Sequence, residues 1–174
     1  MSIIGRMVKR FIVAPRVRKL TWEQLCAAGA VSRERFEAQI ADETEESASV
    51  SARGAMSVKD TLAHLTVANR GIAARLEGLR TGQSMDSRSP DLFPGANGKM
   101  LDQVKSEHGE SWRQLAEKAA SPIDSSATAP HQFFGPMTAS EWVAAIAVHY
   151  EYHSRRIDRV KQSEEYRQSL KATW

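Results

Sequence analysis

Apolar residues recur at helical spacing in four segments of this sequence, and no segment alternates between apolar and polar residues as a strand would. The four segments cover residues 21–44, 58–80, 99–120 and 139–162, and loops of about a dozen residues join them. Helices of this length with such connections predict an all-α fold, an antiparallel four-helix bundle. The loops are longer than a minimal bundle needs, and long loops in a small domain usually cross the bundle or line a site.

Capping signals mark where these helices begin and end. Ser57 precedes the second segment as its N-cap, and Thr138 precedes the fourth with Glu141 three residues later, which is a capping box. Gly82 ends the second helix and Pro122 stops the third. The first segment is less uniform, because the stretch AAGAVS and the start signal Ser32 allow a break inside it.

Length and composition predict one globular domain with two less ordered ends. The chain has 174 residues, which suits a single core. We expect a flexible basic arm over 1–20, the bundle over 21–162 and a polar tail over 163–174. No stretch is long and apolar enough for a membrane span, so no membrane partner is expected. Cys26 is the only cysteine and has no disulfide partner in the chain, which favours the cytoplasm as the compartment.

The positive charge of the chain is concentrated at its N-terminus. The net charge is +3, yet the first 20 residues alone carry six basic side chains and no acidic one, so the remainder sums to −3. This arm is either an untidy N-terminus or a docking segment for nucleic acid or another anionic surface. Since the rest of the chain is not basic and no helix resembles a recognition helix, no nucleic-acid partner is expected.

Two histidines interrupt the apolar stripe of the fourth segment. His149 and His153 lie four residues apart, between Ile146 and Ile157 on the same helical face. Residues at this spacing have Cβ atoms roughly 6 Å apart, so both imidazoles can reach one metal ion. Without a metal, each ring needs its own hydrogen-bond partner. The alternative is a chance pair at the edge of the core, and the spacing alone leaves both interpretations open.

His64, at the border of the apolar stripe of the second segment, is the third candidate ligand. Three neutral imidazoles and one open position are what a catalytic divalent metal prefers. His108 lies on the third segment, where it is either a fourth ligand or a residue at the edge of the core. His131 lies in a loop and is expected to be solvated. The chain has no C-x-x-C, no Gly-rich phosphate loop and no G-x-S-x-G motif.

Two stretches resemble a known family. MSVKDTLAHL is similar to the W-S-x-x-[DE]-x-L-x-H-L segment of the DinB-like (YfiT-like) proteins, and MTASEWVAAIAVHYEYHSRRI is similar to their fourth helix with its H-x-x-x-H pair. The resemblance extends over 32–161. It implies an up-down-down-up bundle with one long crossover. It also implies a divalent metal, commonly zinc or nickel, held by His64, His149 and His153.

The chain departs from the family pattern in two places. Met56 stands where the family has a tryptophan that packs under the loop leading into the second helix. That loop is therefore expected to be arranged differently. The basic arm has no counterpart in the family pattern.

The family resemblance also implies a function. Members include thiol-dependent transferases and a maleylpyruvate isomerase, in which the metal activates a low-molecular-weight thiol. The expected function is therefore a metal-dependent transferase with a small-molecule substrate. The catalytic residues stay unknown, and Asp60, Asn69 and Glu151 are candidates to orient a ligand imidazole. A homodimer is one assembly that the resemblance allows.

Two other functions remain open from the sequence. One is a hydrolase that uses metal-bound water against a small toxic compound. The other is a stress-related protein that binds a metal or ligand without catalysis. A structural zinc usually has four protein ligands, so His108 as a fourth ligand would favour the non-catalytic protein.

Overall fold

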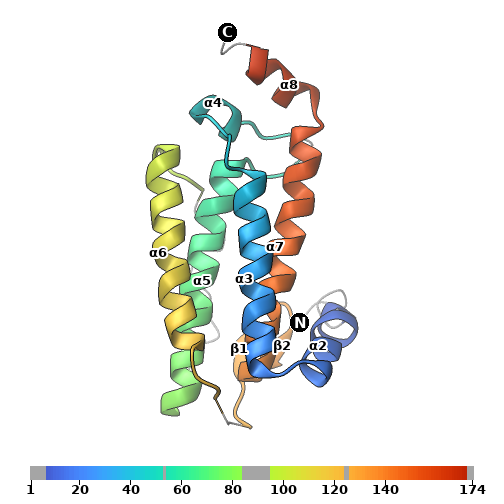
Figure 1. Cartoon of the computed structure of the whole chain (residues 1–174), viewed down its shortest axis with the longest axis vertical. Coiled ribbons are helices and arrows are strands. Elements are labelled where there is room, and N and C mark those ends of the chain that lie inside the picture. The colour runs from blue at the N-terminus through green and yellow to red at the C-terminus, as the bar shows by residue number, and fades with distance from the viewer. Residues whose placement is uncertain (1–6, 53, 84–94, 124–125, 172–174) are drawn as a thin grey trace.

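Four long helices pack side by side in the computed structural model, which describes residues 7–52, 54–83, 95–123 and 126–171 (Figure 1). The order of colours in Figure 1 shows that the first and last of them run upward and the two middle ones run downward. This up-down-down-up order confirms the predicted all-α bundle and its long crossover, which joins the two parallel middle helices. The four helices are α3 (Trp22–Gln39), α5 (Val58–Thr81), α6 (Leu101–Ala119) and α7 (Ala139–Lys161).

Side-chain caps fix the starts of three of these helices. Thr21, Ser57 and Thr138 each accept a hydrogen bond from the backbone N–H three residues later, before α3, α5 and α7 respectively. Such a cap stabilises a helix by about 1 kcal/mol. Gly82 ends α5 in a left-handed conformation with φ of 71°, which glycine adopts without strain. The boundaries predicted from the sequence for α5 and α7 are therefore confirmed.

Helix α3 is continuous, although the sequence allowed a break at AAGAVS. Gly29 lies inside it and faces α7, and a Cβ atom at this position would lie 3.1 Å from Cγ2 of Ile146. The glycine therefore serves the close approach of two helices rather than a turn. Ser32 is a buried residue within the helix and caps nothing.

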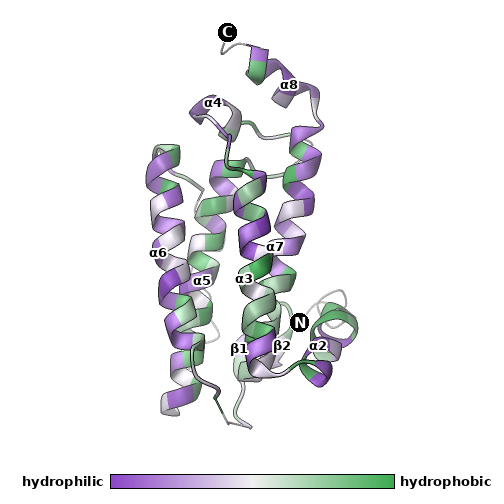
Figure 2. Cartoon of the chain, in the orientation of Figure 1, coloured by the Kyte–Doolittle hydropathy of each residue, from purple (hydrophilic) through white to green (hydrophobic). Residues whose placement is uncertain are grey.

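The core lies between the four long helices. Figure 2 shows that each of them carries both hydrophilic and hydrophobic residues along its length, as an amphipathic helix must. Burying a large apolar side chain contributes roughly 1.5–3 kcal/mol, so these residues hold the bundle together. The largest side chains that are almost completely buried include Phe36, Leu62, Leu65, Leu115, Tyr150 and Ile157.

The N-terminal segment differs from the flexible arm that the sequence predicts. It forms a π-helical turn, η1 (Lys9–Val13), followed by the short helix α2 (Ala14–Lys19), and both pack against α7. Val13 is fully buried, and Arg16 forms an ion pair of 2.9 Å with Glu151 on α7. Burial of Val13 and the ion pair of Arg16 thus hold in place a segment whose charge alone suggested disorder.

A small β-hairpin lies where α7 begins, at the lower end of the bundle in Figure 1. Strand β1 (Ala129–His131) pairs antiparallel with β2 (Gly135–Met137), in a region that the sequence predicts as loop. Gly135 has φ of 73°, which suits the tight turn. The other elements are α4 (Glu45–Ala48) and α8 (Glu164–Lys171), which lie at the opposite end. Among the described residues, no helix has the length and apolar character needed to cross a bilayer.

Candidate metal centre and its pocket

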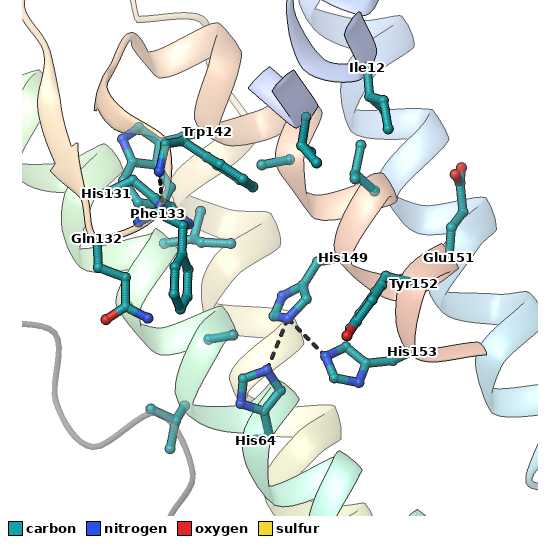
Figure 3. Close-up of a pocket in the computed structure, with 18 of the residues that line it drawn as sticks. Ile12, His64, His131, Gln132, Phe133, Trp142, His149, Glu151, Tyr152 and His153 are labelled. Atoms are coloured by element: carbon teal, nitrogen blue, oxygen red, sulfur yellow. Dashed lines mark hydrogen bonds between the residues drawn. The ribbon is translucent and has the colours of Figure 1, made fainter. Parts of the chain in front are cut away.

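The three histidines proposed from the sequence lie together between α5 and α7. His64 projects from the N-terminal half of α5, and His149 and His153 project from α7 toward it (Figure 3). Nε2 of His149 lies 2.9 Å from Nε2 of His64 and 3.0 Å from Nε2 of His153. The potential ligand atoms of the three residues lie within 4.8 Å of one another.

These three nitrogens cannot satisfy one another by hydrogen bonding alone. A neutral imidazole offers one N–H and one lone pair. Nε2 of His149 faces two other ring nitrogens, so it cannot form a good hydrogen bond with both. A cation that accepts a lone pair from each ring removes this conflict. In a tetrahedral zinc site with Zn–N bonds of about 2.0–2.1 Å, the ligand nitrogens are about 3.3 Å apart, close to the two separations observed. The donor set therefore fits a divalent metal ion.

Burial keeps two of these rings neutral. His153 is only 3% exposed, and its pKa is lowered to about 2, first by burial and then by the neighbouring His149 and His64. The pKa of His149 is lowered to about 3, again mainly by burial. A lone pair must be free for a metal to bind, so protons compete little at this site near neutral pH.

One ring atom of this cluster lacks a hydrogen-bond partner. Nδ1 of His153 is buried and unpaired among the described residues. Metal-binding histidines usually donate from the second nitrogen to a carboxylate or carbonyl. The three residues proposed from the sequence for that task have other partners. Asp60 accepts from the backbone N–H of Ala96, Asn69 donates to Tyr150, and Glu151 pairs with Arg16.

The histidine cluster opens onto a pocket of about 790 Å³ between α5, α7, the hairpin and the N-terminal segment. Its wall is mostly apolar and aromatic, with Tyr152 beside the cluster and Phe133 and Trp142 toward the hairpin (Figure 3). Val8 and Ile12 close it on the side of η1. A pocket of this size with a few polar groups in an apolar wall is typical of a site for a small organic molecule.

His108, the proposed fourth ligand, lies elsewhere in the core. It is buried on α6, and its Nε2 lies 2.8 Å from the hydroxyl of Tyr150. Its Nδ1 lies 3.4 Å from a carboxylate oxygen of Glu37. His108 belongs to a polar network inside the bundle, and the histidine cluster of the described residues has three members.

His131 is a pocket residue that the sequence did not identify, since it was expected to be solvated. It ends strand β1, stacks on Phe134 with ring centroids 4.2 Å apart, and lies 5.0 Å from the ring of Trp142. Nδ1 accepts hydrogen bonds from the backbone N–H groups of Phe133 and Phe134. The hairpin that places His131 here has no signal in the periodicity of the sequence.

Comparisons with known proteins agree with this architecture. The profile of the DinB superfamily matches residues 13–157. The crystal structure of TT2238, a four-helix bundle protein, aligns with a TM-score of 0.64 and 21% sequence identity, over 79% of this chain and 98% of that one. An identity this low shows a shared fold alone. No curated protein matches the sequence. The resemblance seen in the two sequence motifs is thereby confirmed.

Proposed function

The chain belongs to the DinB superfamily, and we propose that it is a divalent-metal-dependent enzyme that transfers a group to or from a low-molecular-weight thiol. The observation that carries the proposal is the meeting of His64, His149 and His153 at the wall of a large pocket. Zinc and nickel are the metals that the family resemblance implies, and imidazole ligands suit both.

The number of ligands favours a catalytic site over a structural one. Structural zinc usually has four protein ligands and no open position. The cluster has three imidazoles among the described residues, and His108 is occupied by Tyr150 and Glu37. A metal held by these three imidazoles would keep one coordination position for a ligand from solution.

Each part of the site has a distinct task. A divalent metal bound by the imidazoles supplies Lewis acidity, which lowers the pKa of a coordinated thiol or water. Burial holds the rings of His149 and His153 neutral, so they present lone pairs at neutral pH. The aromatic side chains of Phe133, Trp142 and Tyr152 form a wall that excludes water from one side of a bound molecule.

Metal content is the first test of this proposal. We expect tag-free protein to retain about one equivalent of zinc or nickel by plasma mass spectrometry. His149→Ala and His153→Ala should lose the metal while keeping their helical circular dichroism. His131→Gln is the matched control, because His131 lines the same pocket outside the cluster. Wild-type protein that stays free of metal after addition of zinc or nickel would refute the site.

The thiol requirement needs a separate measurement. Cobalt(II) replaces zinc in many imidazole sites, and coordination of a thiolate to cobalt gives a charge-transfer band in the near ultraviolet. We expect this band when cobalt-loaded protein is titrated with cysteine, and none with serine. A spectrum unchanged by cysteine would refute thiol coordination without contradicting the metal site.

A further inference from the structure

The pocket that adjoins the histidine cluster has an excess of positive charge. Its lining includes four arginines, Arg16, Arg75, Arg155 and Arg156, and one carboxylate, Glu151. Arg16 is paired with Glu151, so three guanidinium groups have no carboxylate among the lining residues. Two of these, Arg155 and Arg156, follow the histidine pair on α7. Arg75 is different, because it comes from α5 and lies at the hairpin end.

Arg75 is a buried guanidinium without an acidic partner among the described residues. Only 7% of its surface is exposed. It donates to two backbone carbonyls, from Nη1 to Gly71 at 2.9 Å and from Nε to Pro130 at 3.3 Å. The group also lies over the ring of Trp142, 4.9 Å from its centroid. These contacts hold the side chain in place and leave its charge unneutralised.

This arrangement is costly unless an anion completes it. A buried charge needs a partner of opposite sign, and a guanidinium has five N–H donors, of which two are used here. Burial alone lowers the pKa of Arg75, yet the group stays charged at neutral pH. Its unused donors are suited to a carboxylate or a phosphate.

His131 supplies a second donor beside Arg75. Because Nδ1 accepts from two backbone N–H groups, the neutral ring carries its proton on Nε2. No described residue accepts from this Nε2–H, and the ring lines the pocket. The pKa of His131 is lowered to about 4 by burial and by the charge of Arg75, so the ring acts as a neutral donor.

The spacing along α5 sets the length of the ligand. His64 and Arg75 are eleven residues apart, which places them on the same helical face with Cα atoms about 16 Å apart. The pocket lining on this stretch of α5 is apolar and includes Ala68 and Ile72, and α7 contributes Ala145. An elongated molecule with an anionic group at one end and an apolar body matches this arrangement, in which Arg75 lies at one end and apolar residues follow along α5.

We propose that the pocket takes an elongated organic anion, whose charged group binds Arg75 and His131 and whose apolar body extends along α5 toward the three histidines. This inference deepens the proposed function, because it names the class of substrate for the same site. The anion subsite consists of residues outside the histidine cluster, so it can be tested on protein stripped of metal.

Binding of octanoate to metal-free protein, measured by isothermal titration calorimetry, tests the proposal. We expect octanoate to bind at least about tenfold more tightly than octan-1-ol, since a charge-assisted bidentate contact is worth that much or more. Arg75→Gln should remove this preference and leave the affinity for octanol unchanged. Arg70→Gln, an exposed arginine on the same helix, is the matched control and should bind as wild type does.

Each result bears on the proposal. Equal affinities of the wild type for octanoate and octanol, or no binding of octanoate, would overturn it. So would Arg75→Gln that binds octanoate as tightly as wild type. Arg75→Lys keeps the positive charge, so it separates loss of charge from any disturbance of the hairpin. This variant should retain part of the preference for octanoate over octanol. Octyl phosphate distinguishes the two anions, since the tighter ligand identifies the natural group. Wild-type protein that binds octanoate but takes up no added zinc or nickel would support the anion subsite and refute the metal function.

Discussion

Replacing Tyr150 with phenylalanine tests the polar network inside the bundle. The hydroxyl of Tyr150 lies 2.8 Å from Nε2 of His108 and accepts from Nδ2 of Asn69 at 3.0 Å. Nδ1 of His108 faces Glu37, so it carries the ring proton and Nε2 accepts from the tyrosine. Asn69 also donates to Ser111. These distances allow an assignment of donors and acceptors in which each of these polar groups has a hydrogen-bond partner.

The expected loss of stability follows from the buried polar groups that lose the tyrosine hydroxyl as their hydrogen-bond partner. Phenylalanine fills the same volume, so no cavity forms and packing is retained. The change leaves the lone pair on Nε2 of His108 and one N–H of Asn69 without a hydrogen-bond partner, and both residues are buried. Each stranded group costs about 1–3 kcal/mol, and partial relaxation reduces the sum, so we expect the free energy of unfolding to fall by about 2–4 kcal/mol.

Urea denaturation followed by circular dichroism at 222 nm measures this loss. Tyr152→Phe is the matched control on the same helix, because Tyr152 is 53% exposed and its hydroxyl accepts only from Arg156 among the described residues. We expect this control to lie within about 0.5 kcal/mol of wild type. A loss below about 1 kcal/mol for Tyr150→Phe, or equal losses for the two variants, would refute the network as an anchor of the core.

Three further predictions concern metal, pH and helix packing. Zinc at about 100 times its Kd should raise the Tm of metal-free protein by about 5–10 °C, and His153→Ala should show no rise in differential scanning fluorimetry. His131 has a folded pKa of about 4, below its unfolded value, so its contribution to stability is complete above pH 6.5 and is lost as the pH falls toward 4. The free energy of unfolding from urea titrations should therefore fall more steeply over that range in wild type than in His131→Gln, by up to about 1.4 kcal/mol per pH unit, and parallel curves would contradict this. Gly29→Val should destabilise the protein because its side chain would meet Ile146, whereas Gly109→Ala, with open space around it, should stabilise α6 by up to about 1 kcal/mol in the same denaturation assay.

The bundle was predictable because its signals are local. Caps at Ser57 and Thr138 and the stop at Gly82 act within one helical turn, so the sequence places the ends of α5 and α7 correctly. Gly29 shows the limit of that method. A glycine inside a helix suggests a break, whereas its reason lies in Ile146, which is distant in sequence and close in space.

The histidine cluster was predictable for the same reason, and the pocket around it was not. His149 and His153 are related by one helical turn, and His64 lies at the border of the apolar stripe of its own helix, a choice with which the family motif agrees. The other walls of the pocket come from the hairpin and from η1, and the periodicity of the sequence predicts neither element. His131 and Arg75 lie together although they are distant in sequence, and Arg75 donates there to the carbonyl of Pro130 in β1, 55 residues away.

The stretch HYEYH on α7 shows how one helix serves both the core and the site. Successive residues on a helix point about 100° apart, so His149 and His153 face the pocket while Tyr150 faces the core. Tyr150 is 1% exposed and is held by residues of α5 and α6, which fixes the rotation of α7 about its axis. That rotation sets the direction in which both imidazoles project. The polar network therefore positions the two imidazoles that we propose as metal ligands, and Tyr150→Phe should weaken zinc affinity by more than Tyr152→Phe does while leaving the stoichiometry unchanged.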